Sequence, residues 1–159
     1  MWIVAFRSGG AWSFETIATI PVQALATSLV LDSLDHPHVA YDEFLAVGIR
    51  YAKRTPSGWI TTLVDSGQRW DPCLVLDANG APHIAYYDAD VGALRYATLV
   101  GGRWRRQVID DSPSELNRIG RDPAIVLDRD GRAHVSYHEH PENSPCELKY
   151  AVSTPLAEP

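Results

Sequence analysis

The sequence predicts an all-β protein made of repeated four-stranded units, and the repetition itself is the main observation. One pattern of apolar, acidic, histidine and tyrosine residues occurs three times, at intervals of 45 and 51 residues. A period of this size is typical of supersecondary units that bury their apolar faces by stacking on one another. The three segments are LVLDSLDHPHVAYDEF from Leu29, LVLDANGAPHIAYYDA from Leu74 and IVLDRDGRAHVSYHEH from Ile125.

Each unit is expected to hold four short antiparallel strands, which in the middle unit are 73–77, 81–87, 93–99 and 103–109. These segments are short apolar runs or alternate apolar with polar residues, and helix signals are absent. Between the first two strands stands Asp77-Ala78-Asn79-Gly80. This is a turn sequence, because the Asp side chain caps its own turn and Asn-Gly accepts positive φ.

Four antiparallel strands per repeat of this length are typical of a β-propeller blade. The chain therefore reads as a β-propeller segment of about three four-stranded blades. A β-sandwich and an open β-solenoid built from the same hairpins are the alternatives. The expected blades fill residues 1–153, as a partial blade at 2–20, blades at 27–66 and 72–111, a blade lacking its last strand at 123–153, and a tail at 154–159.

Three blades are fewer than the four to eight of a typical closed propeller. An incomplete ring would leave blade faces and strand edges open, and such edges invite pairing with other chains. We therefore expect either a fragment of a longer propeller or a protomer that self-associates into a homo-oligomer. In the second case residues 11–20 of one copy would complete the last blade of another.

The segment GAPHIAYYDADVGALRYA, from Gly80 to Ala97, resembles the blade repeat of bacterial sialidase-like or BNR-like β-propeller proteins. The Asp-box of sialidases, Ser-x-Asp-x-Gly-x-Thr-Trp, is missing, so no catalytic residue is carried over from them. The resemblance implies a protein that is extracellular or attached to the cell surface. The chain as given has no signal peptide, because Met1 leads directly into an apolar segment without a basic region or cleavage site.

Composition narrows the classes of partner. The formal net charge is −6 and no run of Lys or Arg occurs, which argues against nucleic acid or an anionic membrane as a partner. No apolar stretch approaches the length of a membrane span. Two cysteines, Cys73 and Cys146, are too few for a disulfide framework or a metal cluster. We expect Cys73 to be a small buried side chain, and we expect no cofactor.

Residues that recur at one register are best explained by the blade itself. The recurring histidines His38, His83 and His134 are expected to be hydrogen-bonded structural residues rather than metal ligands. The turn at 128–131 is acidic, but the chain lacks the other ligands of a calcium loop, so no metal site is expected. Arg50, Arg95 and Lys149 form a second recurring set that we interpret as structural or solvated.

Function is expected where the repeats differ. The invariant Asp turns lie at one end of the strands, and the connections that change in length lie at the other end, which in repeat proteins is usually the binding face. Arginine suits acidic groups and tryptophan stacks on sugar rings, so these residues suggest a glycan or a partner protein as ligand. The candidate ligand-binding residues at that end are Arg69, Trp70, Tyr87, Asp88, Arg118, Arg121, His138 and His140.

An enzymatic alternative stays open, namely a polysaccharide lyase or glycoside hydrolase of sialidase-like propeller type. His138 or His140 with Tyr87 could abstract a proton beside a uronate carboxylate, while Arg118 or Arg121 neutralises that carboxylate. Asp88 and Glu139 could instead act as the paired carboxylates of glycoside hydrolysis. The spacing in the sequence specifies neither arrangement.

Overall fold

The computed structural model describes residues 2–19, 25–43, 48–111, 118–140 and 145–154. All regular structure in these ranges is β-strand, in thirteen strands and without a helix, which confirms the all-β expectation. A helix long and apolar enough to cross a bilayer is accordingly not found in these ranges.

The strands form four antiparallel sheets, and within each sheet the strands are neighbours in chain order. Sheet A contains β1 (Trp2–Ser8) and β2 (Ala11–Ala18), and sheet B contains β3 (Thr27–Leu31), β4 (Pro37–Glu43), β5 (Gly48–Thr55) and β6 (Gly58–Asp65). Sheet C contains β7 (Arg69–Leu76), β8 (Pro82–Asp88), β9 (Ala93–Val100) and β10 (Arg103–Asp110), and sheet D contains β11 (Arg118–Leu127), β12 (Ala133–His140) and β13 (Glu147–Val152).

The first strands of sheets C and D begin earlier than the sequence predicts. They were expected from about residues 72 and 123, but β7 begins at Arg69 and β11 at Arg118. Each strand crosses an irregularity at an Asp-Pro pair, where Asp71 has φ 55° and Asp122 has φ 47°. Proline donates no backbone hydrogen bond, so a bulge there lets the strand continue on its far side.

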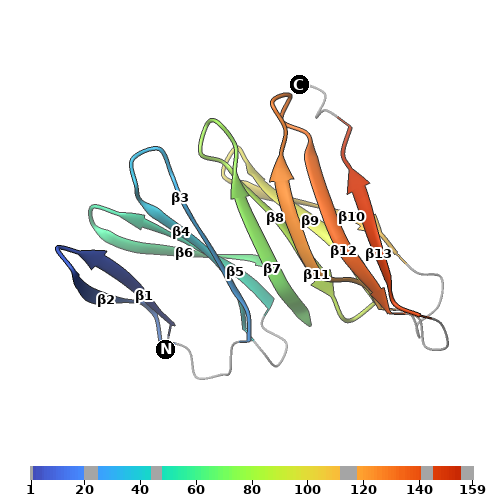
Figure 1. The fold of residues 1–159 in the computed structure, drawn as a ribbon, viewed down its shortest axis with the longest axis horizontal. Coiled ribbons are helices and arrows are strands. Elements are labelled where there is room, and N and C mark those ends of the chain that lie inside the picture. Colours follow the sequence, from blue (N-terminus) through green and yellow to red (C-terminus); the bar gives the residue numbers. More distant parts are fainter. Residues whose placement is uncertain (1, 20–24, 44–47, 112–117, 141–144, 155–159) are drawn as a thin grey trace.

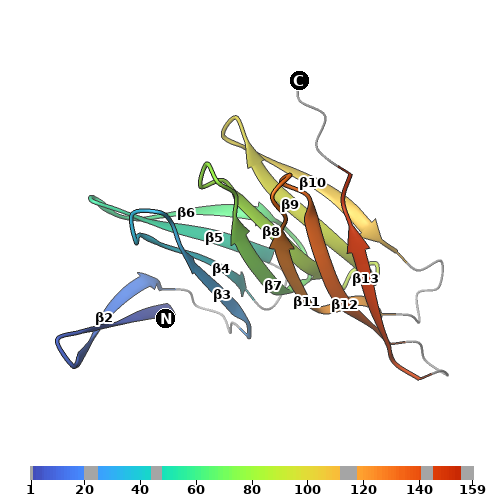
Figure 2. The same cartoon turned by 45° about the horizontal axis from the view of Figure 1, so that its top comes forward.

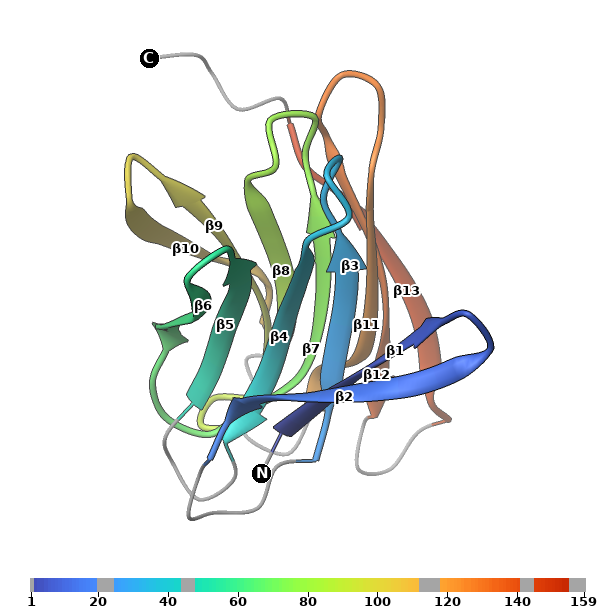
Figure 3. The same ribbon diagram turned by 90° about the vertical axis from the view of Figure 1, so that its left-hand side faces the viewer.

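The sheets follow one another across the molecule in chain order (Figure 1). Their first strands are close neighbours, because β7 contacts both β3 and β11, as the view from the left-hand side of Figure 1 shows (Figure 3). Where β3 meets β7, the backbone N–H of Leu74 donates to Ser28 Oγ at 3.0 Å. Small side chains at the matching positions, Ser28, Cys73 and Ala124, allow this close approach. Cys73 is half-buried rather than fully buried, and Cys146 is exposed.

Apolar clusters between successive sheets hold the fold together. The B–C cluster joins side chains such as Ile49 and Tyr51 to Leu74 and Tyr86, and the C–D cluster is built in the same way. A smaller cluster joins Val4 and Ile17 of sheet A to sheet B. The second strands β4 and β8 are buried along their whole length, because both of their faces meet a neighbouring sheet.

The recurring histidines are hydrogen-bonded within each sheet, as the sequence predicts. In every repeat Nδ1 contacts the hydroxyl of a tyrosine on the third strand, and Nε2 lies 3.2–3.8 Å from Oδ2 of the turn aspartate. This Asp–His–Tyr chain links the turn to the second and third strands. Its members are Asp32, His38 and Tyr51; Asp77, His83 and Tyr96; and Asp128, His134 and Tyr150.

A second recurring hydrogen bond joins successive sheets. Tyr86 Oη donates to Asp65 Oδ2 of sheet B at 2.9 Å, and Tyr137 Oη donates to Asp110 Oδ2 of sheet C at 2.6 Å. Burial, reinforced by the aspartate, raises the pKa of both tyrosines far above the ordinary value. Asp65 and Asp110 each stand six residues after a tryptophan. The equivalent residue of sheet A, six residues after Trp12, is Ala18, which has no carboxylate to accept such a bond.

Candidate functional site

The two ends of the strands differ in chemistry. We call the end with the Asp turns the turn end and the opposite end, where β4, β8 and β12 finish, the loop end (Figure 1). The expected site residues all lie at the loop end: Arg69 pairs with Asp88 and Trp70 with Tyr87 across β7 and β8, and Arg121 pairs with His138 across β11 and β12.

Arg69 lies at the centre of a buried ion network. Its Nε contacts Asp65 Oδ2 at 3.1 Å, and its Nη1 contacts Asp88 Oδ1 and Asp90 Oδ2, each at 2.6 Å. Only 11% of the side chain is exposed. Burial acts to lower its pKa, but the bonds to Asp90 and Asp65 outweigh burial, so the pKa is raised and the charge is held. Arg69 thus fixes three carboxylates of its own chain.

Asp88 belongs to the same network and repeats in the other sheets. Its carboxylate is fully buried and also binds Arg95 Nε. Sheets B and D carry the same pair, since Arg50 contacts Glu43 at 2.8 Å and Lys149 contacts Glu139. The second recurring set of cations therefore binds a recurring set of carboxylates within its own sheet. Asp88 and Glu139, expected as paired catalytic carboxylates, occupy this one repeated position on two different sheets.

An aromatic and cationic stack bridges sheets C and D. The Arg121 guanidinium carbon lies 5.5 Å from the ring centre of Trp70 and 5.3 Å from that of Tyr87, and the two rings are 5.9 Å apart with a tilt of 51°. Arg121 Nε also contacts Asp71 Oδ2 at 3.2 Å. We call Trp70, Asp71, Tyr87 and Arg121 the stack cluster.

Exposure within the stack cluster decides what a ligand could meet. Tyr87 is buried, Trp70 is half-buried, and the Arg121 side chain is 29% exposed. The sequence suggests tryptophan as an open stacking platform, but here the arginine lies over the rings. Because Nε of Arg121 contacts Asp71, a ligand would bind Arg121 through its terminal guanidinium nitrogens.

Asp71 is the member of this cluster that sequence reasoning missed. Burial raises the pKa of its carboxyl, partly offset by the charge of Arg121, while Asp122 and Asp42 raise it further. Asp42 lies on β4 of sheet B, is completely buried, and accepts hydrogen bonds from the backbone N–H groups of Leu25 and Ala26 at 2.7 and 3.1 Å. The repeated bulge signal Trp70-Asp71-Pro72 and Arg121-Asp122-Pro123 could have identified it.

The two loop-end histidines of sheet D, His138 and His140, are more exposed than the recurring histidines of the turn end. His138 is 46% exposed with Nδ1 at 3.9 Å from Asp122 Oδ2, and its ring centre lies 6.0 Å from that of His140. His140 Nδ1 contacts Cys146 Sγ at 3.0 Å. Within the described ranges, no three His, Cys, Asp or Glu side chains gather closely enough to hold a metal ion.

The structure brings some of the expected residues together and separates others. Arg121 meets Trp70 and Tyr87, and it pairs in the ladder with His138. Asp88 is instead fully buried and held by Arg69 and Arg95. The backbone of Arg118 pairs with His140, but the side chain of Arg118 lies outside the described part of the structure.

The chain matches no family model and no curated protein. Among solved structures it is similar to a protein of unknown function from Dyadobacter fermentans, with a TM-score of 0.71 and 13% identity over 94% of this chain and 44% of that one. It is also similar to an endo-1,4-beta-xylanase from Bacteroides thetaiotaomicron, with a TM-score of 0.51 and 17% identity over 89% of this chain and 63% of that one. A fucose lectin from Kordia zhangzhouensis matches with a TM-score of 0.47 and 14% identity, over 80% of this chain and 97% of that one.

These likenesses concern the fold alone, because all three identities are low. The chain spans less than half of the Dyadobacter protein and less than two thirds of the xylanase.

Proposed function

We propose that this chain is a run of consecutive β-propeller blades whose loop end binds a ligand, with an acidic glycan as the ligand that fits best. Support for the propeller comes from the packing. Successive sheets repeat one interface, and their first strands lie next to each other at one side, as radial packing around an axis requires.

The stack cluster is the observation that carries the binding proposal. Arg121 is held over two aromatic rings and by Asp71, so its position is fixed before a ligand arrives. Such preorganisation reduces the entropy lost on binding. A guanidinium suits a carboxylate bidentately and the edge of Trp70 adds apolar contact, which together match a sugar acid.

Cleavage of the glycan is the second candidate, and the geometry supports it less well. Asp88 is fully buried between Arg69 and Arg95, and Glu139 contacts Lys149. A general acid needs access to the leaving oxygen, whereas these two carboxylates are occupied by cations of their own chain. Tyr87, the partner suggested for His138 in a lyase reaction, is buried under Arg121.

Binding can be measured by calorimetry with neutral and uronate-containing oligosaccharides. We expect uronates to bind, and we expect Arg121→Ala to weaken binding about 10-fold or more, as loss of one charge-assisted bidentate contact predicts. Arg132→Ala is the matched control, since Arg132 is an ion-paired arginine of the turn end. Equal affinity of the Arg121→Ala protein and the unchanged protein would overturn the proposal.

The cleavage candidate has its own readout. Uronate products would be followed by absorbance with the unchanged protein and with His138→Ala. Turnover that disappears in His138→Ala would favour the enzyme over a binding module, whereas bound but uncleaved oligosaccharide favours the binding module.

A further inference from the structure

A tryptophan of the fourth strand packs in the groove between its own sheet and the preceding sheet. Trp104 on β10 meets Tyr51 of sheet B edge to face, with ring centres 5.5 Å apart and an interplanar angle of 75°, and its Nε1 donates to Thr62 Oγ1 at 3.3 Å. Trp59, at the same position on β6, packs in the cluster between sheets A and B. A fourth strand thus places an indole on the sheet before it.

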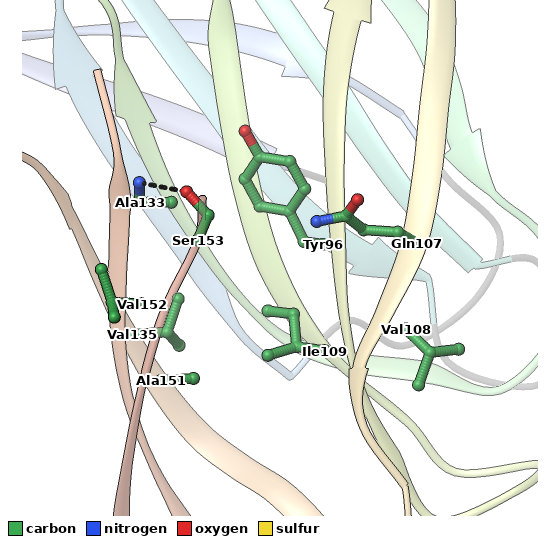
Figure 4. A pocket seen from close by; sticks show the side chains of 9 residues that line it. All are labelled: Tyr96, Gln107, Val108, Ile109, Ala133, Val135, Ala151, Val152 and Ser153. Carbon is green, nitrogen blue, oxygen red and sulfur yellow. Dashed lines mark hydrogen bonds between the residues drawn. The ribbon is translucent and has the colours of Figure 1, made fainter. Parts of the chain in front are cut away.

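The groove between sheets C and D holds no such indole from the described residues. Tyr96 and Gln107, the equivalents of Tyr51 and Thr62, line a cavity of about 190 Å³ there. A cavity of roughly 150 Å³ already accepts a benzene ring. Figure 4 shows these two side chains facing those of sheet D, among them Val135, Ala151 and Ser153. The groove therefore has the size and lining for an aromatic side chain.

Sheet D has three described strands, and β13 lies at its edge and at the margin of the molecule (Figure 2). Its outward face is apolar and open. Tyr150 is 64% exposed whereas the equivalent Tyr96 is 7% exposed, and Leu148 is 75% exposed whereas Leu94 is fully buried. The equivalents are covered because another sheet follows them.

The other end of the chain carries the complementary features. Trp12 on β2 stands where Trp59 and Trp104 stand, but it is 60% exposed. Leu29 on β3 is 50% exposed, whereas its equivalent Leu74 is 3% exposed, because sheet A offers two strands instead of four to pack against. Sheet A thus carries an exposed tryptophan, and sheet D borders a cavity that could hold one.

We propose that two copies of this chain close a ring of six sheets, in which β2 of each copy becomes the fourth strand of the other copy's sheet D. Trp12 then enters the groove lined by Tyr96 and Gln107. Sheet B of the second copy follows and covers Tyr150 and Leu148 with its β3. The inference rests on the propeller arrangement proposed above, and six blades lie within the usual range of closed propellers.

In this exchange β13 takes the place of β1 along β2, since both are third strands of the repeat. β13 is the better anchored of the two, because Tyr150 bonds His134 and Lys149 pairs with Glu139. β1 has Val4 at the tyrosine position and belongs to a two-stranded sheet, which has little stability of its own. Exchange of a terminal element between copies is a low-cost route to dimers.

Sedimentation equilibrium tests the number of copies. The chain has a mass of 17.6 kDa, so the proposal predicts a species of twice that mass. We expect Trp12→Ala to raise the dimer dissociation constant about 100-fold, as for a central aromatic anchor. Trp70→Ala, a tryptophan change at the loop end, should leave it within about 3-fold. A monodisperse monomer at all concentrations would overturn the proposal.

Cross-linking tests the strand exchange itself. With the two native cysteines changed to serine, the repeat register places residue 13 of one copy opposite residue 152 of the other. Ser13→Cys with Val152→Cys should give a disulfide-linked dimer, whereas Ser13→Cys with Phe6→Cys, a pair within β1 and β2 of one copy, should not close. The opposite result contradicts the exchange. Glycan affinity is measured separately, so a monomer that binds uronates would overturn this inference alone.

Discussion

The turn end and the loop end of this protein use the same strands for different purposes. At the turn end one Asp–His–Tyr chain is built three times from equivalent residues. At the loop end the equivalent positions hold Asp42, Tyr87 and His138, which are a buried acid, a covered ring and an open imidazole. Uniform contacts are expected to carry stability, and contacts that vary are expected to carry recognition.

The ion network around Arg69 lies at the loop end, but it is buried, so we expect it to contribute to stability rather than to recognition. We expect Arg69→Ala to lower the free energy of unfolding by up to about 3–5 kcal/mol, since it removes the closest cation from buried Asp65 and leaves buried Asp88 with Arg95 alone. Urea denaturation measures the loss. Arg106→Ala is the control: Arg106 is 45% exposed and 3.8 Å from Asp65, so about 1 kcal/mol or less is expected. Equal losses of unfolding free energy in Arg69→Ala and Arg106→Ala would contradict a structural role for Arg69.

The two tyrosine hydrogen bonds between sheets, Tyr86 to Asp65 and Tyr137 to Asp110, can be compared with each other. Tyr86→Phe removes a hydrogen bond to the Asp65 carboxylate, and we expect a loss of about 1.5–3 kcal/mol in the free energy of unfolding. Tyr137→Phe removes the equivalent bond to Asp110, whose side chain is 30% exposed rather than 10%. Because water can replace a bond to an exposed carboxylate, the Tyr137→Phe loss should be the smaller one. A larger loss for Tyr137→Phe than for Tyr86→Phe would contradict this explanation.

Acidification should weaken the turn end in two steps. Burial lowers the pKa of His38 and His83 in the folded protein, so the unfolded chain takes up a proton first, and stability falls as the pH drops below about 6.5. The backbone N–H of His36 is the main cause that lowers the Asp32 pKa, to about 2, so a second loss follows between about pH 4 and 2. Thermal melting as a function of pH measures both steps. His83→Gln should flatten the first one, and an unchanged slope would exclude His83 as its source.

Much of the fold could be predicted from the sequence because the repeat fixes the register. Once His38, His83 and His134 are aligned, the strand order and the strand content of each sheet follow. The bulges could not be placed as easily, since the Asp-Pro pairs at 71–72 and 122–123 look like strand starts when backbone pairing is not known.

The candidate site was harder to predict for a physical reason. Asp65, Asp88 and Arg69 come from three different strands, and whether an arginine binds a ligand or its own carboxylates depends on distances that no local pattern encodes. One signal was available: Asp65 and Asp110 each stand six residues after a tryptophan, which marks them as recurring and hence structural. The assignment of Arg121, Trp70 and His138 to ligand binding stays a prediction.

The most direct test separates stability from recognition in a single variant, Arg121→Ala. Arg121 is partly exposed and occupies a position that the repeats do not share, so its loss should change the free energy of unfolding by about 1 kcal/mol or less. Uronate affinity should fall about 10-fold or more in the same protein. Paired denaturation and calorimetry give both numbers. A protein that is strongly destabilised, or one that binds uronates as well as the unchanged chain does, would contradict the assignment of recognition to the loop end.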